Sequence, residues 1–122
     1  MFGGVVMSFA AKYNTPTFLI RESKNLPFRT LKELINENNE KMVYRVNLIY
    51  FNHKTNYDPH PVVVSDDYSI NLPPSLMEVC KRIVSDYEAV DAINKGLVGI
   101  KITSYTNSYG VQYTATWVDL RP

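Results

Sequence analysis

The sequence predicts an α+β domain in which a small, curled antiparallel sheet or barrel carries two to three short helices. Two observations predict it: segments in which apolar and polar residues alternate, and three capping-box motifs that each precede an apolar stripe at helical spacing. The predicted order is one strand, one helix, three strands, two helices and a closing β-hairpin. That order is typical of α+β folds with their helices at one end.

A chain of 122 residues with 45% hydrophobic residues has room for one modest core. We therefore expect one domain over residues 17–122, preceded by a flexible N-terminal segment over residues 1–16. The codons for Gly3 and Gly4 can form a purine-rich GGAGG shortly before the codon for Met7, as in a bacterial ribosome-binding site. We hypothesise that Met7 is the native start.

The first predicted elements lie before residue 42. Thr17–Ile20 is a short apolar run that predicts a strand, and residues 21–29 are polar, contain a proline and predict a loop. Thr30 and Glu33 have the spacing of a capping box at a helix start. Residues 36–41 are rich in asparagine and are expected to end this helix. Its apolar face comprises Leu31, Leu34 and Ile35.

The middle of the chain predicts three strands. Met42–Phe51 alternates over ten residues and predicts one long strand. Residues 52–61 carry two prolines and several Asn and Asp residues, which indicates a loop. Val62–Val64 and Tyr68–Leu72 predict two further strands, separated by a turn at Asp66-Asp67.

Two helices are predicted next. Pro73-Pro74 ends the preceding strand, and the segments Ser75–Glu78 and Ser85–Glu88 both match the capping box. Gly96 is expected just beyond the second helix, where a positive φ costs glycine little. The predicted apolar stripes are Leu76, Val79, Ile83 and Val84 in the first helix, and Ala89, Val90 and Ile93 in the second.

The last segment predicts a β-hairpin with strands Leu97–Tyr105 and Val111–Leu120 around a turn at Asn107–Gly110. This register places apolar residues on one face and polar residues on the other, whereas a slip of one residue would mix them. The predicted pairs are Tyr105 with Gln112, Thr103 with Thr114, Lys101 with Thr116, Ile102 with Ala115 and Ile100 with Trp117.

Catalytic and metal motifs are weak. His53, Asp58 and His60 share one loop, but their spacing matches no common metal-ligand pattern. Cys80 is the single cysteine, so no intrachain disulfide forms, and it has no histidine near it in sequence. No apolar run reaches the length of a membrane span. We therefore expect a non-enzymatic cytoplasmic protein without cofactor, metal site or membrane contact.

The feature that points to a function is a group of cations accompanied by exposed tyrosines. Small β-barrels hold RNA or single-stranded DNA with cations at phosphates and aromatic rings against bases. The net charge is only +1, but residues 1–54 hold eight bases and four acids, whereas residues 55–122 hold five bases and eight acids. The predicted nucleic-acid-binding residues are Arg21, Lys24, Arg29, Arg45, Lys54, Lys101, Tyr105 and Tyr109.

A resemblance supports an RNA ligand. The segment DYEAVDAINKGLVGI (residues 86–100) resembles a helix–glycine–strand segment of PUA RNA-binding domains, through Asp86, Ala89, Val90, Ile93 and Gly96. The segments INLPPSLMEV, AINKGLVGIKI, YTNSYG and YTATWVD are similar in style to small accessory proteins from plasmids and phages of Gram-positive bacteria, nearest to the PrgU-type conjugation regulators. This resemblance implies a PUA-like fold, messenger RNA as partner and repression of a surface-adhesin operon.

The residues leave three functions open. The first is an RNA-binding regulatory module on a PUA-like barrel, and the second is a single-stranded DNA-binding protein on an OB-like barrel. The third is a protein-interaction or assembly module without nucleic acid, in which an apolar strip forms a homodimer. That strip comprises Phe9, Phe18, Leu19 and Ile20.

Overall fold

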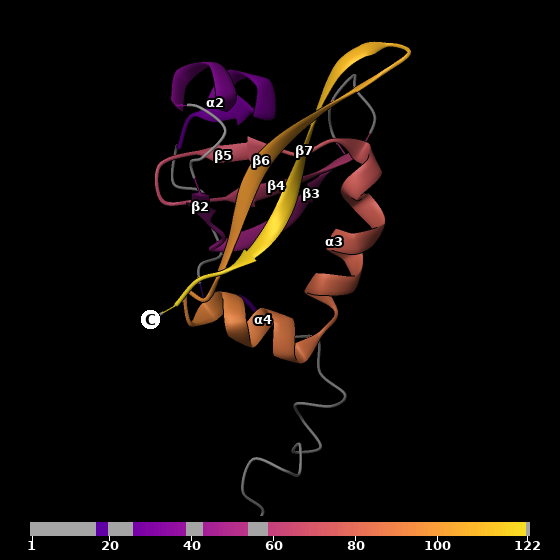
Figure 1. The fold of residues 1–122 in the computed structure, drawn as a ribbon. Coiled ribbons are helices and arrows are strands. Elements are labelled where there is room, and N and C mark those ends of the chain that lie inside the picture. Colours follow the sequence, from indigo (N-terminus) through magenta and orange to yellow (C-terminus); the bar gives the residue numbers. More distant parts are fainter. Residues whose placement is uncertain (1–16, 20–25, 39–42, 54–58, 122) are drawn as a thin grey trace, which may run out of the picture.

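The computed structural model describes residues 17–19, 26–38, 43–53 and 59–121. In this part of the chain, two sheets are flanked by three α-helices (Figure 1). The α+β prediction is therefore confirmed. The expected single antiparallel sheet is wrong, because there are two sheets, and across the described strands they do not close into a barrel. The predicted N-terminal segment, residues 1–16, lies outside the described residues.

The four-stranded sheet has the order β1-β5-β4-β3. Its strands are β1 (Phe28–Thr30), β3 (Leu48–Asn52), β4 (His60–Val64) and β5 (Ser69–Asn71). β1 and β5 are parallel, and the other pairs are antiparallel. The loop predicted over residues 21–29 is therefore wrong at its end, where Phe28 and Arg29 form β1. Three residues are too few to show an alternating pattern, so only the partner strand reveals this one.

The three-stranded sheet has the order β2-β6-β7, with β2 (Val43–Arg45), β6 (Val98–Asn107) and β7 (Gly110–Asp119). Every predicted pair of the hairpin is confirmed, from Tyr105 with Gln112 to Ile100 with Trp117. Gly110 has a φ of 104°, the left-handed conformation that was expected there.

The chain passes from one sheet to the other at Val46 and Asn47. The N–H of Val46 donates to the carbonyl of Val98 in the three-stranded sheet, and the N–H of Asn47 donates to the carbonyl of Val64 in the other sheet (both 2.9 Å). The prediction of one strand over Met42–Phe51 is therefore wrong. An alternating pattern shows which side chains are buried but not which sheet they join.

Helix α2 (Leu31–Asn38) begins with the predicted capping box. The backbone N–H of Thr30 donates to Glu33 Oε1 (3.0 Å), and the N–H of Glu33 donates to Thr30 Oγ1 (3.2 Å). Leu31 and Leu34 are buried on the predicted face. This reciprocal pair satisfies two backbone donors that a helix start otherwise leaves without partners.

Replacing Thr30 with alanine is expected to lower the free energy of unfolding by about 1 kcal/mol. The hydrogen bonds from Thr30, chiefly that of its backbone N–H, hold the pKa of Glu33 below its ordinary value of 4.5. The stability that this carboxylate contributes is therefore present above pH 4.5 and is lost as the pH falls through the lowered pKa. Urea unfolding near neutral pH should show this deficit for Thr30→Ala and a smaller one for Thr30→Ser. Because alanine keeps the backbone N–H, the pH dependence is tested with Glu33→Gln, whose deficit relative to wild type should narrow in acid. An unchanged deficit would contradict this role.

The two later capping-box predictions fail in different ways. A 3-10 turn, η1 (Pro74–Leu76), precedes α3 (Met77–Val84), and no side chain caps either of them. Ser75 lies inside the turn that the prolines start, so it is not an N-cap. Helix α4 (Tyr87–Asn94) is capped by Asp86 instead of the predicted Ser85, because Ser85 is the C-cap of α3 and still has helical backbone angles. Gly96 has the predicted positive φ, 74°.

Two further predictions are corrected at loops. Thr17–Leu19 forms no strand; instead, the Asn94 amide donates to the carbonyl of Thr17 and accepts from the N–H of Leu19. A side-chain amide therefore takes the place of a partner strand. The loop predicted over residues 52–61 is shorter, because Asn52 ends β3 and His60 begins β4; residues 54–58 lie outside the described residues.

The core lies between the two sheets and is closed at the sides by helices. Figure 1 shows the β6–β7 hairpin crossing the four-stranded sheet, with α3 along one flank and α4 across the base. The buried core residues are Leu31, Leu34, Tyr44, Val46, Ile49, Val63, Ile70, Leu72, Cys80, Ile93, Ile100, Ile102 and Ala115. Among the described residues, no helix is both long and apolar enough to cross a membrane.

Candidate functional site

The predicted nucleic-acid-binding residues are divided between described and undescribed parts of the chain. The described residues are Arg29, Arg45, Lys101, Tyr105 and Tyr109, whereas Arg21, Lys24 and Lys54 lie outside the described residues. Arg45, Lys101 and Tyr105 belong to the three-stranded sheet, Arg29 belongs to the other sheet, and Tyr109 lies at the hairpin tip. The structure therefore brings together three of the five.

Arg45 and Lys101 lie on adjacent strands of the three-stranded sheet. Arg45 is opposite Gly99 and Lys101 is opposite Val43, so the two cations are diagonal neighbours on the face turned away from the core. Neither forms an ion pair with a described residue. Both remain available to an anionic ligand.

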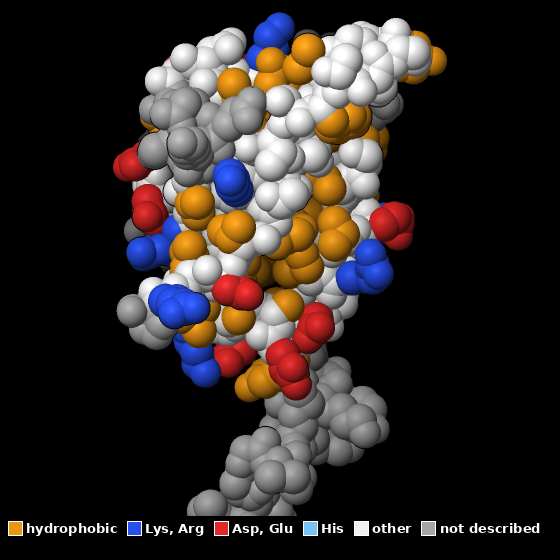
Figure 2. Space-filling model, in the orientation of Figure 1, with side chains coloured by type: hydrophobic (Ala, Val, Ile, Leu, Met, Phe, Trp, Pro, Cys, Tyr) orange, Lys and Arg blue, Asp and Glu red, His pale blue; other side chains and the backbone are white. Residues whose placement is uncertain are grey.

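The charge on this side of the molecule is sparse. Figure 2 shows several Lys and Arg side chains at the lower left and others at the centre, right and top, with Asp and Glu near the base and at both edges. Hydrophobic side chains lie between the hairpin and α3. The hairpin has no charged residue from Ile102 to Val118. A ligand held here would gain only a few phosphate contacts, so most of its affinity would come from stacking and hydrogen bonding.

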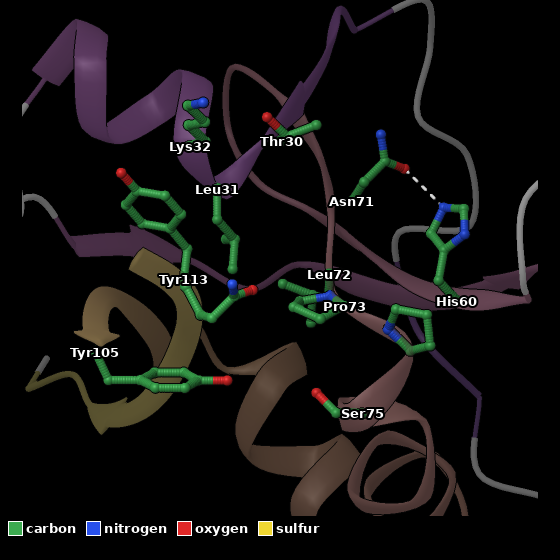
Figure 3. A pocket seen from close by; sticks show the side chains of 12 residues that line it. Thr30, Leu31, Lys32, His60, Asn71, Leu72, Pro73, Ser75, Tyr105 and Tyr113 are labelled. Atoms are coloured by element: carbon green, nitrogen blue, oxygen red, sulfur yellow. Dashed lines mark hydrogen bonds between the residues drawn. The ribbon is translucent and has the colours of Figure 1, made fainter. Parts of the chain in front are cut away.

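A cleft of about 800 Å³ lies where the hairpin meets the start of α2 and the turn before α3. Tyr105 and Tyr113 approach it from the hairpin, Lys32 and Thr30 from the start of α2, and Asn71 from β5 (Figure 3). The described residues that line it are Thr30, Leu31, Lys32, His60, Asn71, Leu72, Pro73, Pro74, Ser75, Tyr105, Gln112 and Tyr113. We call it the hairpin cleft.

The walls of the hairpin cleft combine apolar surface with donors of hydrogen bonds. Two tyrosine rings, two prolines and two leucines supply flat apolar surface, while Lys32 supplies the one positive charge of the described lining. Two amides and several hydroxyls complete the polar lining, and no described lining residue is Asp or Glu. This composition suits a flat heteroaromatic ligand that carries negative charge.

One polar pair in the cleft has a defined geometry. Nε2 of His60 lies 3.1 Å from Oδ1 of Asn71. Asn71 belongs to β5, where its backbone lies between Thr30 of β1 and Val62 of β4. The amide therefore sits on a strand that is held from both sides, with its oxygen engaged by the imidazole.

Arg29 is engaged within the protein. Its Nε lies 3.1 Å from Glu37 Oε1, Nη1 donates to the carbonyl of Phe28 (2.9 Å), and the guanidinium stacks 5.4 Å from the ring centroid of Tyr68. These contacts stabilise the junction of β1 and α2. A phosphate at Arg29 would have to compete with Glu37.

The remaining predicted groups lie apart from the cleft. Tyr109 is 88% exposed at the hairpin tip. In the apolar strip suggested for a homodimer, Leu19 is 77% exposed and Phe18 packs against the core, while Phe9 and Ile20 lie outside the described residues. Within the described ranges, no three His, Cys, Asp or Glu side chains are grouped as metal ligands.

Sequence reasoning did not identify most of the hairpin cleft. It singled out Tyr105 alone among the lining residues as a binding residue, and it placed His60 in a loop and Thr30 in a cap. Lys32, Asn71, Gln112 and Tyr113 were not proposed as binding residues. The lining comes from five separate stretches of sequence, and the only local signal was the polar face of the hairpin.

Comparison with known proteins gives no family. No protein-family model matches the sequence, and no curated protein or solved structure shows significant similarity to it.

Proposed function

We propose that this protein is a cytoplasmic regulatory module that binds single-stranded RNA, with one base in the hairpin cleft and the adjoining backbone along Arg45 and Lys101. The observation that carries the proposal is the cleft itself: two tyrosine rings beside Lys32 and two amides, with no carboxylate in the described lining. Aromatic rings and amides are the groups with which proteins stack and read unpaired bases.

The outer face of the three-stranded sheet supports a path for the strand. Lys101, Thr103 and Tyr105 alternate along β6, so their side chains share the face turned away from Ile100 and Ile102. The distance from Lys101 to Tyr105 along the strand is about 14 Å, at about 3.4 Å per residue. A strand of RNA can therefore touch the cations and the cleft together.

The PUA-like or OB-like assignment belongs to this proposal. The corner at Val46 and Asn47, where one run of chain serves two sheets, is a device that small barrels use to curl. This corner supports the interpretation of the two sheets as an open form of such a barrel.

The experiment is a fluorescence anisotropy titration with a labelled single-stranded RNA of about 12 nucleotides. Tyr105→Ala is expected to weaken binding about 5- to 150-fold, since one stacked base contributes about 1–3 kcal/mol. Tyr105→Phe keeps the ring and should keep the affinity. Tyr87→Ala is the matched control, because Tyr87 is also about half exposed, at 44%, but lies on α4.

The cations are tested by salt dependence. Replacing Arg45 and Lys101 with glutamine should reduce the slope of log affinity against log salt by about 1.4, because each lost phosphate contact removes about 0.7 for a single strand. Wild type that does not bind RNA, or a Tyr105→Ala affinity equal to wild type, would overturn the proposal. If the protein bound poly-dT more tightly than RNA, the ligand would be single-stranded DNA instead of RNA.

A further inference from the structure

The contact between His60 and Asn71 determines which atom of the Asn71 amide is left to bind a ligand. An amide oxygen accepts only, so the contact of 3.1 Å requires that Nε2 of His60 carries the proton and donates to Oδ1 of Asn71. Figure 3 shows the amide nitrogen of Asn71 on the side away from the imidazole. Nδ2 has no hydrogen-bond partner among the described residues, so its N–H groups are open to a ligand at the Asn71 end of the cleft.

We propose that the hairpin cleft selects keto bases over amino bases, with Asn71 reading the base and His60 acting as the positioning residue that fixes its amide. This inference rests on the proposed function. Uracil and guanine present a carbonyl oxygen that accepts from Nδ2 of Asn71. Cytosine and adenine present an amino group at the corresponding position, and an amino group facing Nδ2 leaves two donors without an acceptor.

The charged groups of the lining favour the same direction. Lys32 is a donor only, and no described residue of the lining offers a carboxylate to accept from an exocyclic amine. The backbone of Asn71 is also fixed in place: β5 pairs with β1 and β4 at Asn71, and the next N–H, of Leu72, donates to the carbonyl of Pro61 (3.0 Å). The contact with His60 holds the amide in this orientation as long as Nε2 of His60 carries the proton.

Uracil and cytosine are the sharpest probes, because they have the same size and differ only in the groups at positions 3 and 4. The experiment compares oligo-U and oligo-C of equal length by anisotropy on the full chain. We expect wild type to bind oligo-U about 5- to 100-fold more tightly than oligo-C, the range that one wrongly paired buried donor produces. Asn71→Asp presents an acceptor and should reverse this preference.

A control variant distinguishes a reversed base preference in Asn71→Asp from the general effect of an added negative charge. Asn107→Asp adds the same negative charge at the hairpin tip, where the side-chain oxygen can still accept from the N–H of Tyr109. This variant should lower the affinities for oligo-U and oligo-C by the same factor and leave the ratio of the two affinities unchanged. A ratio that moves equally in both variants would contradict direct readout by Asn71.

His60 is tested through the same ratio. His60→Ala frees the amide and should bring the U-to-C ratio toward one, whereas His60→Gln can still donate to Asn71 Oδ1 and should restore the preference. Equal wild-type affinities for oligo-U and oligo-C would overturn this inference while leaving RNA binding intact. Absence of binding to either oligomer would instead overturn the proposed function.

Discussion

Replacing Ile100 with alanine is expected to lower the free energy of unfolding by about 2–5 kcal/mol, the largest effect of any single substitution considered for this protein. Ile100 is fully buried near the start of β6, the middle strand of its sheet, where it lies opposite Tyr44 of β2 and Trp117 of β7. Alanine would leave a cavity between the two sheets. Domains of this size have a total stability of about 5–15 kcal/mol, so the variant should be close to unfolding.

Two controls accompany this prediction in urea unfolding. Ile100→Val removes one methyl group and should cost about 0.5–1.5 kcal/mol. Tyr109→Ala lies at an exposed site and should stay within about 0.5 kcal/mol of wild type. If Ile100→Ala unfolded at the same urea concentration as Ile100→Val, the core would not lie between the two sheets as described.

The thiol of Cys80 is expected to react at least about 100-fold more slowly with a thiol reagent in the native protein than in urea at the same pH. Cys80 is fully buried in α3, and burial raises its pKa from 9.0 to about 11. Two units of pKa reduce the reactive thiolate about 100-fold, and exclusion of the reagent adds to this. The measurement is the rate of reaction with Ellman's reagent.

The same group makes stability fall in alkali. Because the folded pKa is raised, the neutral thiol contributes stability below pH 9.0, and this is lost as the pH rises toward about 11. In Cys80→Ala, the free energy of unfolding should no longer fall between pH 9 and pH 11 because of this group. The variant should also be less stable than wild type at neutral pH, because it loses the packing of the sulfur atom. Fast native labelling at neutral pH would show that α3 does not cover the core at Cys80.

The parts of this fold that could be predicted from the sequence are those whose interacting residues lie close together in the chain. The hairpin could be placed residue by residue because a slip would expose Ile100 and Ile102. The capping box of Thr30 and Glu33 could also be predicted, because both residues lie within one helical turn. At Ser85 the predicted N-cap was displaced by one residue, because Ser85 is the C-cap of the preceding helix and Asp86 caps the next one.

The parts that sequence could not provide depend on distant segments. The corner at Val46 and Asn47 exists because two different sheets supply the partners Val98 and Val64. The parallel strand β1 is defined by its pairing with β5. The hairpin cleft is the clearest case, because Lys32, Asn71 and Tyr113 have no local pattern that would group them.

The charge pattern illustrates the same limit. The excess of cations in residues 1–54 accompanied the predicted nucleic-acid-binding residues, but Arg29 is ion-paired with Glu37 and stacked on Tyr68. Only Arg45 and Lys101 of the described predicted cations share a face. Charge counts therefore overstated the phosphate contacts, and the tyrosines and amides of the hairpin cleft became the stronger argument.

The most direct test of single-stranded RNA binding in the hairpin cleft is photo-crosslinking with an oligo-U that contains 4-thiouridine, followed by mass spectrometry of the peptides. We predict crosslinks at Tyr105 or Tyr113, within the tryptic peptide that follows Lys101, and their loss on competition with unlabelled oligo-U. Crosslinks confined to α3 and α4, with none on the hairpin, would contradict the central claim.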